Sequence, residues 1–227
     1  MAATGRLPAE GVRRMFDAIA PVYDAMNHVM TAGLDRRWRR ITAAETVRSG
    51  DRVLDACCGT GDLAVAALRA GGRVTGLDFS ERMLERARRK EPAIEWVQGD
   101  VLALPFDDAS FDAVTVGFGV RNVDDLEAGL RELRRVLRSG GRIGVLEITT
   151  PQGALAPFYR VWFDHVVPLI GRRLPGGAEA YTYLPASVRR FPVPGELADL
   201  LAASGFERVR YRLFAGGIVA LHVGEAL

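Results

Sequence analysis

Apolar runs of strand length alternate with helical stretches along most of this chain. The strand-like runs cover residues 52–56, 73–78, 94–101, 111–116 and 142–147, and helical patterns follow at 63–68, 80–87 and 124–137. A helix at 195–204 precedes two closing runs, 209–214 and 217–223, joined by a tight turn at Ala215-Gly216. The alternation predicts one α/β domain, residues 1–227, and the closing pair predicts an antiparallel hairpin at its end.

Residues 1–50 precede the first strand, and a minimal sheet does not need them. Residues 11–19 have helical periodicity. Because the ligand loop of such a sheet opens at its carboxyl edge, this N-terminal segment is interpreted as a lid. Its polar contacts are expected to be Tyr23, Asp24 and Asn27. The arginine-rich segment 35–41, around Trp38, is interpreted as a solvated face.

A glycine turn joins the first strand to the first helix of the alternation. Gly59 and Gly61 lack a Cβ, so the turn can take positive φ and a ligand can lie against bare backbone. The spacing Gly59-x-Gly61-x-x-Ala64 also fits the loose dinucleotide fingerprint, so the glycines alone do not identify the ligand. The loop, with Thr60 between its glycines, predicts a nucleotide-type site.

Carboxylates around this loop narrow the choice of ligand. Asp55 ends the first strand, and Asp62 stands at the helix start, where a pyrophosphate would need free amide hydrogens. Two carboxylates there would repel an anion but suit a cofactor with positive charge and no phosphate. S-adenosylmethionine, with its ammonium and sulfonium groups, is such a molecule. Asp62 has a structural alternative as an acid favoured in a first helical turn.

The next two strands also end in acids. Asp78 follows Gly61 at the spacing at which an acid meets ribose hydroxyls, and Ser80 has the character of a helix N-cap. Asp100 is placed for the adenine amine, with Val101 and Phe79 covering the ring faces. Three successive strands with carboxyl-terminal acids predict an adenosine ligand, although Asp100 as a simple loop cap stays an alternative.

Composition argues against several classes of protein. The 227 residues are 48% hydrophobic, enough for the core of one domain, and a net charge of +2 argues against a nucleic-acid partner. Cys57 and Cys58 are adjacent and have no second pair, which argues against a disulfide framework or a metal site. The chain shows no signal-peptide core and no window near the roughly 18 apolar residues of a membrane span. A cytoplasmic location is expected.

Motifs along nearly the whole chain resemble those of the quinone-biosynthesis C-methyltransferases. They are Phe16-Asp17-x-Ile19-Ala20-x-x-Tyr23-Asp24-x-x-Asn27, the loop 55–62, Gly76-Leu77-Asp78-Phe79-Ser80-x-x-Met83-Leu84, Phe118-Gly119-x-Arg121-Asn122-Val123, Tyr181-x-Tyr183-Leu184 and Gly216-Gly217-Ile218-x-Ala220-Leu221-His222. The loop and Asp78 are general to methyltransferases. The stretch 118–123 and the two C-terminal motifs are narrower and carry the resemblance to this family.

The resemblance implies a class I, Rossmann-like methyltransferase fold with a seven-stranded, mostly parallel sheet whose last strand is antiparallel. It implies S-adenosylmethionine as cofactor. The contacts that it implies are Thr60, Asp78, Asp100, Val101 and Gly117, and they join Asp55, Gly59, Gly61 and Phe79 from the residue patterns. Gly117 stands where family members often have Ser, so only backbone contacts remain at that position.

The acceptor that the resemblance implies is a polyprenylated, demethylated naphthoquinol, methylated as the last step of menaquinone biosynthesis. An unsubstituted ring carbon must attack the sulfonium methyl, and deprotonating the neighbouring hydroxyl raises electron density on that carbon. Arg121 is the first candidate for stabilising the phenolate, because guanidinium stays charged and donates hydrogen bonds. Tyr23, Tyr181 and His165 are candidates for proton relay, and Arg121 with Tyr23 is the predicted catalytic pair.

Several alternatives stay open from the sequence. The acceptor could be a ubiquinone precursor or another aromatic molecule. An NAD-binding oxidoreductase would share the loop and Asp78, and a non-catalytic scaffold would bind cofactor without turnover. Residues 151–192 are interpreted as an acceptor-side insertion. Its apolar stretch 158–170, with Trp162, is either a core helix or an interfacial helix for peripheral membrane contact. A homo-oligomer is also open.

Overall fold

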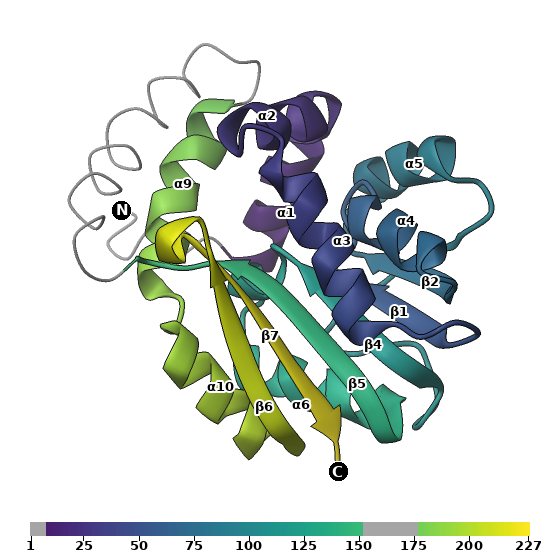
Figure 1. Ribbon diagram of the computed structural model, residues 1–227. Helices are drawn as coiled ribbons and strands as arrows, with labels where there is room; N and C mark the ends of the chain where they lie inside the picture. Colours follow the sequence, from purple (N-terminus) through teal and green to yellow (C-terminus); the bar gives the residue numbers. More distant parts are fainter. Residues whose placement is uncertain (1–7, 152–176) are drawn as a thin grey trace.

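A seven-stranded sheet with the order β3-β2-β1-β4-β5-β7-β6 forms the centre of the protein in a computed structural model that describes residues 8–151 and 177–227 (Figure 1). The strands are β1 (Arg52–Ala56), β2 (Arg73–Asp78), β3 (Glu95–Gln98), β4 (Phe111–Gly117), β5 (Leu137–Ile148), β6 (Phe206–Phe214) and β7 (Val219–Ala226). β7 is antiparallel to β5 and β6, and the other pairs are parallel. The predicted sheet is confirmed.

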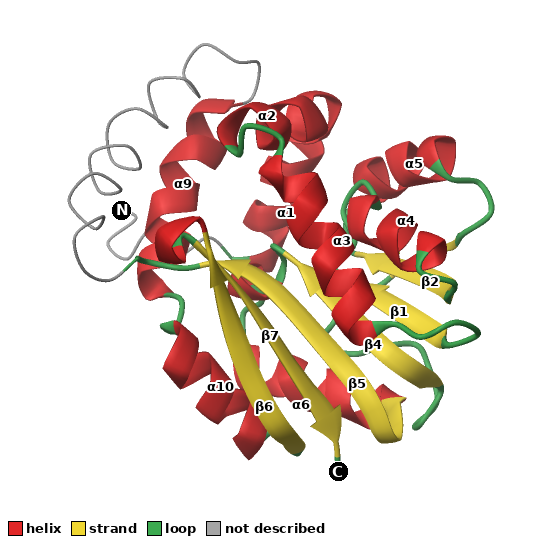
Figure 2. Ribbon diagram, in the orientation of Figure 1, coloured by secondary structure: helices red, strands yellow, loops and turns green. Residues whose placement is uncertain are grey.

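Helices cover both faces of this sheet (Figure 2). They are α3 (Leu34–Thr46), α4 (Asp62–Arg69) and α5 (Glu81–Lys90) on one side, and α6 (Leu126–Val136) and α10 (Pro194–Ala203) on the other. Leu54 of β1 packs with Leu130 of α6 and Leu197 of α10, whereas its neighbour Val53 packs with Ala64 of α4. The alternation follows from the two-residue period of a strand.

The crevice for a ligand lies where the strand order reverses. β1 pairs with β2 on one side and with β4 on the other, so the loops after these strands diverge. In the loop after β1, Gly61 has φ 85°, and an added Cβ would stand 2.4 Å from the Trp96 ring. Glycine is therefore required there for both backbone conformation and space.

Ser80 begins α5 as its sequence position predicts. Its Oγ accepts a hydrogen bond from the Met83 amide at 3.2 Å, the contact that an N-cap makes. The same hydroxyl donates to Asp17 of α1 at 2.5 Å. The cap therefore ties the N-terminal helices to the edge of the sheet.

The N-terminal helices form a cluster above the carboxyl edge (Figure 1). They are α1 (Ala9–Ile19), the 3-10 turn η1 (Ala20–Val22) and α2 (Tyr23–Met30), and α9 (Gly177–Arg190) packs against α1. Met15 and Met26 are buried there with Met83 of α5 and Val188 of α9. Apolar packing therefore holds this group of helices over the crevice.

The interpretation of segment 35–41 as a solvated face is wrong for its inner residues. Trp38 and Arg39 are buried, and Asp35 receives a hydrogen bond from Arg39 at 2.5 Å. A buried arginine requires a paired carboxylate, and the i,i+4 spacing on α3 supplies one. The outer arginines of this segment, Arg36, Arg37 and Arg40, are exposed as expected.

Three further elements differ from the predicted ones. β5 begins at Leu137, which the sequence pattern puts at the end of a helix, whereas the predicted strand begins only at residue 142. α9 was not predicted, because Pro185 inside it lacks the amide that a helix interior uses. β3 stops at Gln98, before the predicted end at residue 101. The predicted helix 158–170, with Trp162 and His165, lies outside the described residues. Within the described ranges, every helix falls short of the length and apolarity that a membrane crossing needs.

Candidate functional site

A cavity opens at the carboxyl ends of β1, β2 and β4. The predicted cofactor residues that line it are Asp55, Gly59, Thr60, Asp78, Phe79, Asp100, Val101 and Gly117. Gly61 does not line it and acts through the backbone conformation of the loop. The structure therefore brings together residues from four separate segments that the sequence pattern assigned to one ligand.

Asp55 is fully buried, and its carboxylate is only partly satisfied. Oδ1 accepts a hydrogen bond from Thr115 at 2.7 Å, whereas Oδ2 has no hydrogen-bond partner among the described residues. Burial raises the pKa of Asp55 to about 7, although the Thr115 hydrogen bond and the charge of Arg39 oppose the rise. A bound cation would favour the ionised form. Asp55 therefore fits the ammonium group of S-adenosylmethionine.

Asp78 holds the glycine loop at the end of β2. Its carboxylate accepts the Ser80 amide at 2.9 Å and the Gly59 amide at 2.8 Å. Burial raises the pKa of Asp78 to about 6 against the effect of these two hydrogen bonds. Each carboxylate oxygen has a second acceptor position. This arrangement suits the ribose hydroxyls predicted for Asp78.

Asp100 both caps a turn and lines the cavity. Its Oδ1 accepts the Leu102 amide at 2.9 Å, and the residue is exposed beyond the end of β3. Val101 beside it is buried. The ring centroids of Phe79 and Phe16, which belongs to the N-terminal helices, are 6.4 Å apart in an edge-to-face arrangement. The two predicted interpretations of Asp100 are therefore compatible with each other.

The interior of this cavity carries negative charge. Burial raises the pKa of the Cys57 thiol well above its usual range, and the charges of Asp78, Asp55 and Asp100 raise it further. A pyrophosphate brought to the same place would be repelled by these carboxylates. Across the described residues, no group of three or more His, Cys, Asp or Glu side chains is arranged to hold a metal ion. The acidic side chains of this cavity therefore favour a positively charged ligand.

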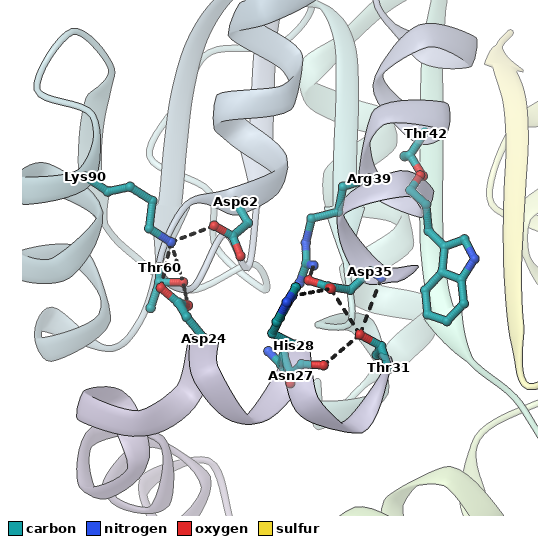
Figure 3. Close-up of polar contacts among 11 residues, drawn as sticks. Asp24, Asn27, His28, Thr31, Asp35, Arg39, Thr42, Thr60, Asp62 and Lys90 are labelled. Carbon is teal, nitrogen blue, oxygen red and sulfur yellow. Dashed lines mark hydrogen bonds and ion pairs between the residues drawn. The ribbon is translucent and has the colours of Figure 1, made fainter. Parts of the chain in front are cut away.

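Lys90, the only lysine of the chain, stands at the rim and was not predicted as part of the site. Its ammonium contacts Asp62 at 2.6 Å, Asp24 at 2.8 Å and Thr60 at 3.2 Å (Figure 3). Lys90 thus partly neutralises the charge of Asp62. Asp62 therefore repels the pyrophosphate of a dinucleotide less strongly than its sequence position alone suggests. Lys90 joins α5, the glycine loop and α2 at one point.

A second cavity, of about 300 Å³, adjoins the first beneath the N-terminal helices. Phe16, Tyr23 and Phe118 line both cavities. The second cavity is mainly apolar, and its further apolar walls are Met15, Ile19, Met30, Leu34, Trp38, Ile148, Leu184, Ile218 and Val219. Apolar walls with a few placed polar groups are typical of sites for aromatic or lipid-like molecules.

Arg121 lines the second cavity and is fixed by a buried carboxylate. It donates to Glu147 at 2.7 Å and to the Phe118 carbonyl, while its Nε has no partner among the described residues. Burial lowers the pKa of Arg121, but the charge and hydrogen bond of Glu147, together with Tyr23 and Tyr183, outweigh burial and leave the pKa above its ordinary value. Arg121 is therefore a permanent cation at the wall of an apolar cavity.

Of the three candidates for proton relay, the structure describes only the side chain of Tyr23. Tyr23 lies between the two cavities, in edge-to-face contact with Phe16 at 6.1 Å. His165 and the side chain of Tyr181 lie outside what the structure describes. Sequence reasoning missed Asp35 and Arg39, which line the second and the first cavity respectively. Their i,i+4 spacing next to Trp38 was the signal that could have identified them.

Comparison with solved structures shows the fold. The structure resembles a SAM-dependent methyltransferase from Thermotoga maritima, described as a possible histamine N-methyltransferase, with a TM-score of 0.65 and 22% identity over 94% of this chain and 99% of that chain. It also resembles the [4+2]-cyclase SpnF, with a TM-score of 0.72 and 19% identity over 97% of each chain. Because a cyclase shares the fold, the fold alone does not settle the reaction.

Relatives in sequence are more informative. A demethylmenaquinone methyltransferase of Deinococcus radiodurans is 46% identical over 95% of this chain and 92% of its own length. One of Thermus thermophilus is 46% identical over 93% of this chain and 99% of its own length. The model of the ubiE/COQ5 methyltransferase family matches residues 5–226. The oxidoreductase alternative is therefore wrong, and the chain belongs to the ubiE/COQ5 methyltransferase family, which uses S-adenosylmethionine.

Proposed function

We propose that this methyltransferase converts demethylmenaquinol to menaquinol. The observation that carries the proposal is the pair of adjoining cavities, one acidic and one apolar, with Phe16, Tyr23 and Phe118 common to both. A cationic methyl donor fits the first cavity, and an aromatic acceptor with an apolar tail fits the second. The names of the relatives support a naphthoquinol as that acceptor.

The residues of this chain have distinct parts in such a reaction. Bound S-adenosylmethionine supplies an electrophilic methyl group, and Asp55 and Asp78 would hold its charged and ribose ends. Arg121 stabilises negative charge on the acceptor hydroxyl next to the unsubstituted carbon, which makes that carbon more nucleophilic. One proton must leave for each methyl group gained. Tyr23, between the cavities, is placed to pass it on.

Tyr23 and the other N-terminal residues would also exclude water. In this proposal residues 1–50 act as a lid, since α1 and α2 contribute walls to both cavities. Residues 151–192 are assigned to the acceptor side, because Tyr183 and Leu184 of α9 line the second cavity. A water-excluded site strengthens the electrostatic effect of Arg121 on the acceptor.

The test is transfer of labelled methyl from S-adenosylmethionine to chemically reduced demethylmenaquinone. The expected result is label on the ring carbon of the naphthoquinol and none on the oxidised quinone. A benzoquinol that models a ubiquinone precursor is the comparison for acceptor class, and preferential labelling of that compound would contradict the assignment. Tight binding of cofactor with no methyl transfer to any quinol would favour the scaffold alternative.

A polyprenyl tail partitions into the bilayer, so we include peripheral membrane contact in the proposal. Its support is the exposure of Val29 (67%) and Leu34 (42%), at the junction of α2 and α3 beside the wall of the second cavity. Such apolar side chains can enter a lipid surface. Flotation with vesicles of anionic lipid is the check: recovery of all protein in the soluble fraction would rule out direct docking.

A further inference from the structure

Among the polar side chains that line the mainly apolar second cavity, two are charged and have opposite hydrogen-bonding character. Arg121, from the loop after β4, can only donate hydrogen bonds. Asp35, from the first turn of α3, can only accept them when ionised. A molecule that fills this cavity and satisfies both must present an acceptor at one place and a donor at another.

Asp35 is held firmly in one place by its neighbours. Its side chain is 5% exposed, and Arg39, itself 7% exposed, donates to Oδ2 at 2.5 Å (Figure 3). Thr31 lies 3.0 Å from Oδ1. Among the described histidines, His28 is near, with Nδ1 at 3.8 Å from Oδ1, and its side chain is half exposed. The ion pair with Arg39 therefore fixes the direction of this carboxylate, whose oxygens accept hydrogen bonds.

Oδ1 of Asp35 still has room for another donor. Thr31 carries a single hydroxyl proton, and its Oγ1 lies closer to the Asn27 carbonyl, at 2.7 Å, than to Asp35. An ionised carboxylate offers about four acceptor positions, and the described contacts of Asp35 use only part of them. A hydroxyl group entering the cavity can therefore donate to Oδ1.

We propose that Asp35 selects the reduced form of the acceptor, an inference that rests on the proposed function. A naphthoquinol carries two ring oxygens in para positions. One becomes the phenolate that Arg121 stabilises, and the other keeps its proton and donates it to Asp35. The oxidised quinone has two carbonyl oxygens and no proton to donate. One carbonyl oxygen of the quinone accepts a hydrogen bond from Arg121. The other faces the carboxylate of Asp35, so that two acceptors meet without a proton between them.

Such selection has a chemical use. The ring carbon of the quinone is electron-poor and does not attack a sulfonium methyl, so a bound quinone would occupy the site without product. A buried acceptor facing another acceptor loses about 10- to 100-fold in affinity relative to a matched pair. Arg121 alone provides little of this discrimination in the bound ground state, because it donates to the oxygen of a neutral hydroxyl group and to a carbonyl oxygen alike.

The test compares equilibrium binding of the two redox forms of a short-tailed demethylmenaquinone. Trp38, in the wall of the second cavity, reports binding through its fluorescence. Saturating S-adenosylhomocysteine prevents turnover, and anaerobic samples with or without a reductant fix the redox state. Wild type should bind the quinol more tightly than the quinone by about 10- to 100-fold. In Asp35→Asn the amide can donate to a carbonyl, so this ratio should approach one.

Two further variants guard against a purely structural effect. Thr31→Val removes a neighbour of Asp35 without changing its acceptor character, so its affinity ratio should stay at the wild-type value. Asp35→Asn leaves Arg39 buried without a carboxylate, and this could prevent folding. The paired variant Asp35→Asn with Arg39→Gln removes both charges, and its ratio should also approach one.

The outcomes separate this inference from the proposed function. A wild-type enzyme that methylates the naphthoquinol, together with an unchanged affinity ratio in the Asp35 variants, would overturn only the role of Asp35. A ratio that falls equally in Thr31→Val would overturn it as well, because packing would then explain the loss. If wild type methylates no naphthoquinol, the acceptor assignment fails and the selection proposed here falls with it.

Discussion

The two cavities of this protein differ in whether their buried charged side chains have partners of opposite charge. In the cofactor cavity Asp55 is buried with one oxygen unpartnered among the described residues, and burial raises the pKa of both Asp55 and Asp78. In the acceptor cavity the buried charges are matched, Arg121 with Glu147 and Asp35 with Arg39. A buried charge of the first cavity therefore needs a charged ligand as its partner. In the second cavity, each buried charge already has a partner of opposite charge in the protein.

This difference shows what each ligand has to supply. A buried unpaired charge is costly unless a partner arrives, so a cationic cofactor gains affinity from the cavity itself. A buried, paired charge is fixed in direction and acts as a preorganised group towards a neutral acceptor. The contrast predicts different consequences when charges are removed on the two sides.

Replacing Arg121 should have the largest effect. Loss of a preorganised donor to developing negative charge typically costs about 10²- to 10³-fold in kcat, so Arg121→Ala should lose methyl transfer by this factor. Binding of S-adenosylmethionine should be nearly unchanged, as measured by calorimetry. Arg131→Ala, on an exposed i,i+4 pair with Glu127, is the matched control and should keep full activity. Equal losses in both variants would contradict the role of Arg121.

Replacing Asp55 should separate stability from binding. Asp55→Asn should weaken cofactor binding by about 10- to 100-fold, because a charge-assisted contact is lost. The same change should raise the free energy of unfolding of the ligand-free protein at pH 8 by roughly 1–3 kcal/mol, since it removes a buried charge that Thr115 and Arg39 compensate only in part. Calorimetry and thermal unfolding measure the two effects. Asp112→Asn, at a surface pair with Arg138, serves as the control.

In wild type, the stability of the ligand-free protein and its affinity for the cofactor should change in opposite directions with pH. The pKa of Asp55 is raised to about 7 and that of Asp78 to about 6, so the folded state binds more protons than the unfolded state between about pH 4 and 7. The contribution of these groups to ligand-free stability therefore falls as pH rises through this window. Cofactor affinity should rise over the same window as the carboxylates ionise. Parallel rather than opposite trends in unfolding and calorimetric titrations would contradict this account.

Replacing Lys90 should have the smallest effect. Lys90→Met removes the contact that joins Asp24 and Asp62 at the rim, and the two carboxylates then repel each other. Partly exposed ion pairs are worth little, so the cofactor KM should rise by only about 2- to 5-fold. Arg89→Met on the same helix, with only an exposed partner in Glu85, is the control. A change greater than 100-fold would mean that Lys90 contacts the cofactor directly.

The cofactor side was largely predictable, because its residues lie in short stretches directly after strands. Parallel strands bring their carboxyl ends to one edge, so Asp55, Asp78 and Asp100 had to meet once the strands were recognised. The sign of their charge then indicated the chemistry of the ligand. The partners of these acids, Lys90 for Asp62 and Thr115 for Asp55, were not predictable, because they are distant in sequence.

The acceptor side was less predictable, because it is assembled from segments that no local rule places together. Arg121 was identified through a motif, but its partner Glu147 lies on another strand and was not. The sequence predicts that Asp35 and Arg39 face solvent, since a charged helix segment is usually exposed. Their burial follows from packing of α3 against the sheet and appears only in the fold.

The sequence by itself determined the strand and helix alternation, the glycine loop and the row of acids, because hydrophobic period and local backbone conformation are encoded residue by residue. The tertiary structure alone decided which charges are paired and which are left for a ligand. Pairing depends on distances between segments far apart in the chain, and burial sets how strongly each pair acts. For this protein, that distinction separates the acidic cavity from the apolar one beside it.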